Sequence, residues 1–204
     1  MGSSTNRLLD AAICGMAAAL AASAARAEEP AGPAEVVAAL HTAIVEVAAG
    51  GTSSDVTDRY AALRPVVART HDLAYIAELS IRRYWDGLTD AERERFVAAF
   101  ERLSVMTYAT RFTAVTPETF AVLGSGDAGR GRVQVRAAIA RTEQDDVALD
   151  YVLEQSGEGW RIVNILADGV SDLALKRAEY HRVLGAGSIE DLIAELDAQA
   201  DRLQ

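Results

Sequence analysis

Few residues in this 204-residue sequence have the type and spacing that catalysis would need. Asp150 stands next to Tyr151 in a segment that alternates between apolar and polar residues. A carboxylate that faces a closed apolar cavity can act as a base, because burial raises its pKa. However, Asp150 shares its alternation phase with Ala148 and Glu154, on the polar side of the predicted strand. We therefore expect a solvated carboxylate, and an isomerase or hydrolase that uses Asp150 remains the alternative.

The three histidines do not have the pattern of a metal site. His41, His71 and His181 lie on separate predicted helical segments, without a second histidine four residues away and without an acidic ligand pattern nearby. Zinc sites bring three or four such ligands together at short, regular spacings. We therefore expect no metal ion and no other cofactor in this protein.

One glycine motif matches a nucleotide-binding loop in spacing alone. Gly124, Gly126 and Gly129 spell G-x-G-x-x-G after a predicted strand. A dinucleotide site needs a helix directly after this loop, because the helix N-terminus holds the pyrophosphate. Here residues 132–139 alternate as a strand does, so we predict a flexible hairpin loop instead. The sequence also contains no nucleophile elbow and no P-loop, and we expect no catalytic residue.

The composition is that of an acidic globular protein. Hydrophobic residues make up 50% of the chain and charged residues 25%, which is enough apolar material for one core. The 30 acidic and 20 basic residues give a formal net charge of -10. Nucleic-acid binding requires a basic face that displaces counterions, so we expect no nucleic-acid partner.

The first 27 residues have the order of an export signal. Arg7 gives a positive start, residues 11–22 carry no charge, and Ala25, Arg26 and Ala27 form a small-residue cleavage site. We predict cleavage after Ala27 and a single domain over residues 28–204. The alternative is a retained amphipathic anchor.

The single cysteine, Cys14, lies inside this leading segment. It follows Ile13, whereas lipoprotein cleavage sites usually have a small residue there, so a lipid-anchored lipoprotein is not expected. Cleavage would leave no cysteine, and the exported chain would therefore contain neither a disulfide nor a reactive thiol.

Helical periodicity precedes and follows a region of strand periodicity. Apolar residues three and four apart predict helices over residues 33–50, 55–69 and 72–85, the second of them interrupted at Pro65. Thr89 and Glu92 form a capping box before a long helix. Alternation with a period of two then predicts strands near residues 120–122, 132–139, 147–154 and 160–166, and helices return towards the end of the chain. This order is typical of an α+β fold.

The expected sheet has about four strands, and the short connections make them antiparallel neighbours. If the sheet curls, a concave apolar cavity forms between it and the N-terminal and C-terminal helices. Such cavities are where ligands bind.

The candidate pocket residues lie on the long helix and on the central strands. They are Phe96, Phe100, Met106, Tyr108 and Phe112 on the helix, and Val133, Val135, Leu149 and Tyr151 on the strands. Periodicity cannot separate the wall of a cavity from a packed core, because both need the same residue types. A filled core would suit an adaptor that binds only protein, and that interpretation stays open.

Three segments resemble a known family. Residues 82–112 read RRYWDGLTDAERERFVAAFERLSVMTYATRF, residues 160–180 read WRIVNILADGVSDLALKRAEY, and residues 187–196 read GSIEDLIAEL. In wording, order and spacing they resemble the MlaC or toluene-tolerance auxiliary family of periplasmic lipid-transfer proteins. The second segment is more similar to the hopanoid-associated HpnM branch than to the phospholipid-carrier branch. The phospholipid branch tends to have an acidic residue where Asn164 stands and a glycine where Ser80 stands.

The resemblance implies a soluble periplasmic carrier rather than an enzyme. Its NTF2-like core would enclose the apolar part of a phospholipid or hopanoid and shuttle it between membranes. The family's motifs place Tyr108, Phe112 and Tyr151 at pocket positions. The implied partners are the periplasmic subunit of an inner-membrane lipid exporter, of the ABC type or another, and an outer-membrane lipoprotein complex.

Overall fold

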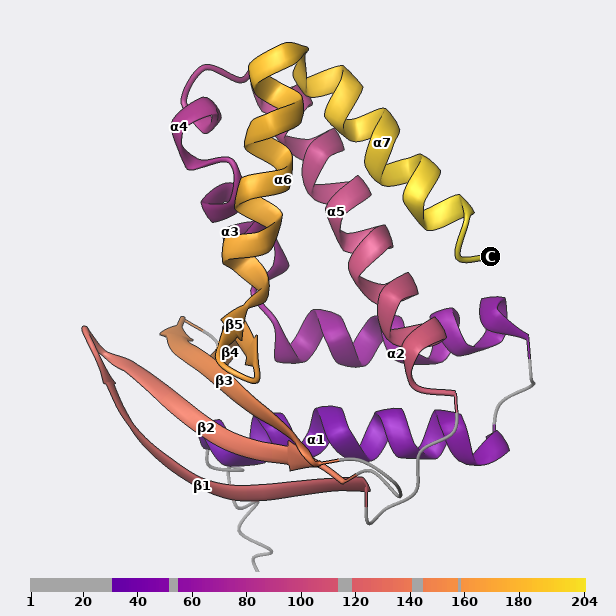
Figure 1. Cartoon of the computed structure of the whole chain (residues 1–204), viewed down its shortest axis with the longest axis vertical. Coiled ribbons are helices and arrows are strands. Elements are labelled where there is room, and N and C mark those ends of the chain that lie inside the picture. Colours follow the sequence, from indigo (N-terminus) through magenta and orange to yellow (C-terminus); the bar gives the residue numbers. More distant parts are fainter. Residues whose placement is uncertain (1–30, 52–54, 114–118, 141–144, 158) are drawn as a thin grey trace, which may run out of the picture.

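The computed structural model of this chain describes residues 31–51, 55–113, 119–140, 145–157 and 159–204. The predicted export signal lies outside these residues. The described elements run in the order helices, strands, helices, and they confirm the α+β class (Figure 1).

The first two helices lie side by side and antiparallel (Figure 1). α1 (Pro33–Glu46) starts with a proline in its first turn and continues into the π-helical turn η1 (Val47–Gly51). α2 (Val56–Thr70) begins at Asp55, whose carboxylate accepts the Thr57 backbone N–H. Pro65 does not interrupt this helix, contrary to our expectation. The carbonyl of Ala61 loses its helical partner there, but Ala61 is exposed, so water can replace the bond.

The predicted third helix is two helices. α3 (Leu73–Ser80) and α4 (Arg82–Trp85) are separated at Ile81, whose φ of -124° and ψ of 26° are not helical. The Ile81 N–H bonds to Glu78, three residues back, which ends α3. The Leu79 carbonyl then accepts two bonds from the Arg177 guanidinium on a later helix. A single long-range side chain therefore stabilises a break that local periodicity did not predict.

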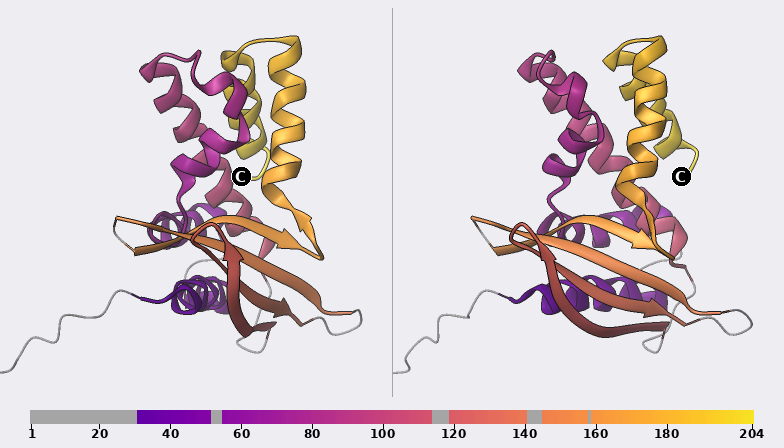
Figure 2. Two further views of the ribbon diagram at one scale, coloured as in Figure 1. Left: turned by 90° about the vertical axis from the view of Figure 1, so that its left-hand side faces the viewer. Right: turned by 60° about the vertical axis from the view of Figure 1, so that its left-hand side comes forward.

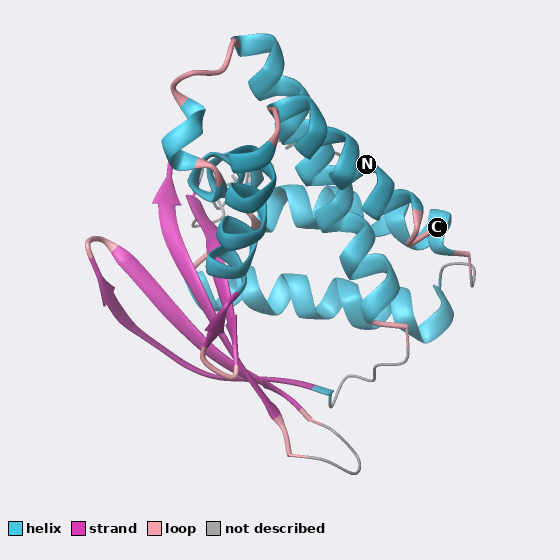
Figure 3. Cartoon of the chain, turned by 45° about the horizontal axis from the view of Figure 1, so that its top comes forward, coloured by secondary structure: helices cyan, strands magenta, loops and turns pink. Residues whose placement is uncertain are grey.

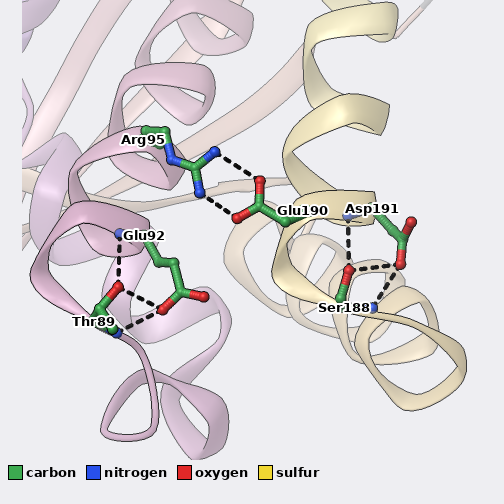
Figure 4. Close-up of polar contacts among 6 residues, drawn as sticks. All are labelled: Thr89, Glu92, Arg95, Ser188, Glu190 and Asp191. Carbon is green, nitrogen blue, oxygen red and sulfur yellow. Dashed lines mark hydrogen bonds and ion pairs between the residues drawn. The ribbon is translucent and has the colours of Figure 1, made fainter.

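The long helix and the last helix start side by side with the same cap. In α5 (Asp90–Arg111) Thr89 and Glu92 form the predicted capping box, and in α7 (Ile189–Asp201) Ser188 and Asp191 do the same. Figure 4 shows both caps, with the Arg95 guanidinium on α5 forming a bidentate ion pair with Glu190 on α7 between them. The two helices run parallel, and α6 (Asp172–Ala186) runs upward beside them (Figure 1).

In the part of the chain that the structure describes, five strands form one antiparallel sheet. They are β1 (Phe120–Gly129), β2 (Arg132–Ile139), β3 (Val147–Ser156), β4 (Gly159–Ala167) and β5 (Val170–Ser171), and they pair in chain order. We expected about four strands, and the additional strand is the two-residue β5. The sheet is curved, with α1 along one of its faces (Figure 2).

The glycine motif lies inside a strand, so the predicted flexible loop is wrong. Gly124, Gly126 and Gly129 are all part of β1, and the turn to β2 is made by Arg130 and Gly131. Gly124 has φ of +147° next to a bulge in the pairing with β2, a conformation that a residue with a Cβ rarely adopts. The glycines therefore allow the edge strand β1 to bend.

The core lies between the sheet and α1 and continues upward into the helices. Val37, Leu40 and Ile44 of α1 are at most 1% exposed. The helical stretch Pro33–Gly50 is long and apolar enough to cross a membrane, judged by length and composition, and no other stretch among the described residues is. In the folded protein it packs against the sheet. The other face of the sheet is open in the described structure (Figure 3).

Candidate functional site

The inner face of the sheet brings the predicted strand residues together. Val135 and Tyr151 are cross-strand partners in β2 and β3, and Leu149 pairs with Ala137 two residues further along the same face. Val135, Leu149 and Tyr151 are buried, whereas Val133, nearer the hairpin, is half-buried. All four belong to the same apolar cluster as α1 or pack against it.

Aromatic rings extend this face to the end of α5. Tyr108 stacks on Phe112 with ring centroids 6.0 Å apart, and Phe112 lies 5.7 Å from Phe120 at the start of β1. Phe120 stacks on His41 at 4.4 Å, and His41 lies edge-on to Tyr151 at 5.4 Å. We call these five residues the aromatic chain. It connects α5, β1, α1 and β3 through the interior, and the sequence analysis did not find two of its members, Phe120 and His41.

Two tyrosine–histidine hydrogen bonds lie in this interior. The Tyr151 hydroxyl is 2.8 Å from His41 Nε2, and the Tyr108 hydroxyl is 3.0 Å from His71 Nε2. Both histidines are buried, with 5% and 6% of their surface exposed. Buried polar groups need such partners, because an unpaired one loses its hydration without compensation. The pairs join α1 to β3 and the end of α2 to α5.

Burial determines the charge state of these four side chains. It lowers the pKa of His41 and of His71 to about 4, so both imidazoles are neutral at pH 7. It also raises the pKa of Tyr151 and holds that of Tyr108 well above its usual value. The negative charge of Asp172, at the start of α6, favours protonation of His71 and Tyr108 and is the smaller effect. The interior is therefore uncharged but not fully apolar.

Three of the predicted pocket residues lie elsewhere. Phe96 and Phe100 pack edge-on against Tyr180 of α6, at 6.2 and 6.5 Å between centroids, inside the helical part of the core. Met106 is buried but does not belong to the main core cluster. The helix period cannot distinguish these positions from Tyr108 and Phe112, because α5 changes its neighbours along its 22 residues.

Asp150 is not part of this interior. It is half-buried on the face of the sheet opposite to Leu149 and Tyr151, and Arg136 is its cross-strand partner. His181 lies on α6, edge-on to Tyr84 at 5.4 Å. Among the described residues, no group of three or more histidine, cysteine or acidic side chains could hold a metal ion. Asp150 therefore does not face the aromatic chain.

Two surface depressions lie along α3 and α5, outside the interior. One of about 460 Å³ is lined by Tyr75, Trp85 and Val97 among others, and a second of about 320 Å³ adjoins it. The second is lined partly by His71 and Arg161. His71 thus contacts a surface depression on one side and the Tyr108 hydroxyl in the interior on the other.

Asn164 and Ser80, the two positions at which the resemblance suggested a departure from the phospholipid branch, have structural contacts. The Asn164 side-chain oxygen accepts bonds from the Ser171 hydroxyl and from the Leu173 backbone N–H, at the start of α6. Ser80 is fully buried and donates to the Ala77 carbonyl at 2.6 Å. Both residues stabilise element ends and lie away from the aromatic chain.

Comparisons with known proteins agree with this arrangement. The profile of the family described as "MlaC protein" matches residues 37–198. A solved structure of a phospholipid-binding protein from Ralstonia solanacearum, in complex with a phospholipid, is 21% identical, with a TM-score of 0.69. The match covers 82% of this chain and 94% of that one. At this identity the likeness shows a shared fold.

Proposed function

The chain belongs to the MlaC family, and we propose that it is a periplasmic carrier that encloses the apolar part of a lipid between its sheet and its helices. One observation carries the proposal: an uncharged layer of apolar and aromatic side chains runs between the inner face of the sheet and α1 and α5. The family is one of lipid-binding carriers rather than of enzymes. The related protein of the same fold that binds a phospholipid supports the same conclusion.

The energetics of a lipid in water favour such a layer. Each exposed CH₂ costs about 0.8 kcal/mol, so a carrier must enclose the chains and can leave the headgroup in solvent. An enclosed chain needs few polar contacts, which agrees with an interior that has two neutral tyrosine–histidine pairs and no charged side chain in the aromatic chain.

We propose that the pocket wall is formed by six of the predicted residues: Tyr108, Phe112, Val133, Val135, Leu149 and Tyr151. Phe96 and Phe100 instead pack against Tyr180 in the helical core that holds α5 in place, and Met106 is buried outside the main core cluster. Most side chains of this layer are buried in the structure, so a lipid must displace some of them. We propose that β1 gives way, since it is an edge strand that pairs on one side only.

The route of transport belongs to the same proposal. The carrier would receive or deliver lipid at the periplasmic subunit of an inner-membrane exporter, and exchange it with an outer-membrane lipoprotein complex. A phospholipid is the cargo that the related structure favours, and a hopanoid is the alternative that the HpnM-like second segment favours. Export by cleavage after Ala27 completes the route.

The test is native mass spectrometry of the full chain, exported with its own leading segment and purified from the periplasm without detergent. We expect a lipid at near-stoichiometric occupancy. Tyr108→Glu should abolish occupancy while the protein stays folded, because Tyr108 is half-buried and a carboxylate there would face the apolar layer. Tyr84→Glu, on the half-buried Tyr84 of α4, is the matched control. A wild-type protein that stays empty after incubation with membranes would contradict the proposal.

A further inference from the structure

The proton on His71 is positioned by its neighbours. His71 Nδ1 lies 3.3 Å from the Val67 carbonyl, which can only accept a hydrogen bond. The Thr70 oxygen lies 2.9 Å from the same nitrogen and also lies 2.9 Å from the Val66 carbonyl and 3.4 Å from the Val67 carbonyl. We assign the Thr70 proton to these helix carbonyls, as is usual for a threonine inside a helix, and the proton of the His71 ring to Nδ1.

The position of this proton also determines the direction of the hydrogen bond between His71 and Tyr108. In neutral His71 a protonated Nδ1 leaves Nε2 with a lone pair, so Nε2 accepts the proton of the Tyr108 hydroxyl at 3.0 Å. The only proton of Tyr108 is thereby used. Its oxygen keeps its lone pairs, and no donor approaches it among the residues that the structure describes.

This oxygen lies inside the proposed pocket wall. Tyr108 is half-buried as a whole residue, but its ring stacks on Phe112 and contacts His71 edge-on, and burial of its hydroxyl raises the pKa of Tyr108. Solvent therefore competes only weakly with a hydrogen bond that is made to this oxygen. A methylene chain has no group that can donate this bond. An ionised phosphate or carboxylate oxygen is only an acceptor, so it cannot bond to the Tyr108 oxygen either. A hydroxyl group on the enclosed part of the lipid can donate to it.

We propose that Tyr108 is a specificity-determining residue that makes this carrier prefer lipids with a hydroxyl group on their enclosed, apolar part. The inference rests on the proposed function, since it needs a lipid in the layer. Two chemical classes carry such a group: hydroxylated acyl chains and polycyclic alcohols. Tyr151 is not assigned this role, because among the residues that the structure describes no hydrogen-bond partner of His41 Nδ1 determines which member of the pair donates.

The experiment uses two matched pairs of probes. The first pair is oleic acid and ricinoleic acid, which is oleic acid with one hydroxyl group on the chain. The second is the polycyclic hydrocarbon cholestane and its alcohol cholestanol. The full-length protein, stripped of lipid, is incubated with phosphatidylcholine vesicles that contain equal amounts of both members of one pair. The bound members are then counted by mass spectrometry.

We expect the hydroxylated member to be enriched about fivefold in the pair that fits, which is the ratio that one net hydrogen bond gives. Tyr108→Phe should reduce the enrichment to about one, because phenylalanine keeps the ring and removes the oxygen. Tyr180→Phe is the control, since Tyr180 is a buried tyrosine in the helical core and outside the pocket wall. It should leave the ratio unchanged.

The outcomes separate the two proposals. Equal binding of both members in the wild-type protein overturns the inference and leaves the carrier function intact. Enrichment that survives Tyr108→Phe overturns the role of Tyr108. A protein that takes up no lipid from any vesicle contradicts the carrier function itself. The pair that shows enrichment identifies whether an acyl chain or a ring system is the hydroxyl carrier.

Discussion

At the scale of single residues, the two buried histidines make the stability of this protein depend on pH. His41 and His71 are neutral because charging them inside the layer would cost hydration, a cost that Val67 and Asp172 offset only in part for His71. In the unfolded chain both would have an ordinary pKa near 6.5. The folded state therefore binds fewer protons than the unfolded state between about pH 6.5 and 4.

This difference predicts acid sensitivity. The free energy of unfolding should be highest above pH 6.5 and should fall as the pH drops towards 4, by up to about 3 kcal/mol for each histidine. Urea denaturation at pH 7 and pH 4.5 measures the loss. The comparison with His71→Gln isolates one contribution, because glutamine can be polar without becoming charged. An equal loss in that variant would show that groups other than His71 cause the acid sensitivity.

At the scale of elements, the junction between β4 and α6 depends on one side chain from the sheet. Asn164 accepts from the Leu173 N–H and the Ser171 hydroxyl, while Ser171 itself caps α6 by accepting from Ala174. The strand and the helix are thus held by a shared cap, with the turn at Asp168 and Gly169 between them.

Substitution of Asn164 tests this junction. Asn164→Ala should lower the free energy of unfolding by about 1 kcal/mol, because a helix N–H and a hydroxyl lose their acceptor. Asn164→Asp should keep the stability or raise it, since an anion near a helix N-terminus is favourable. Thermal and urea denaturation of both variants give the comparison. If the two variants lost the same stability, the acceptor oxygen would not be what matters.

At the scale of the whole molecule, net charge should control how the carrier meets a membrane. The formal charge of -10 repels an anionic surface over about one Debye length. We expect lipid uptake from phosphatidylcholine vesicles to be several-fold faster than from vesicles rich in phosphatidylglycerol at low salt. The difference should shrink in 0.5 M salt, which reduces the Debye length to about 4 Å. Stopped-flow transfer of a fluorescent lipid measures both rates, and a salt-independent difference would exclude electrostatics as its cause.

Local rules predicted most of the elements. The capping box of Thr89 and Glu92, the long helix after it, and the alternation of β2 and β3 are present in the structure as expected. The prediction failed at Ile81, where an arginine distant in sequence binds a freed carbonyl, and at Gly124, where a strand bends. It failed because the contact near Ile81 and the pairing irregularity at Gly124 both involve residues distant in sequence, which local periodicity cannot detect.

Local periodicity was enough to predict the α+β class, the placement of Asp150 on the polar side of its strand, and the set of apolar residues available for a pocket. Which of those residues lie together depends on the tertiary packing. It separated Phe96 and Phe100 from Tyr108 and Phe112, and it paired His41 and His71 with tyrosines distant in sequence. The physical reason is that a buried polar group needs a partner but any nearby element can supply it, so the pairing depends on how whole elements pack.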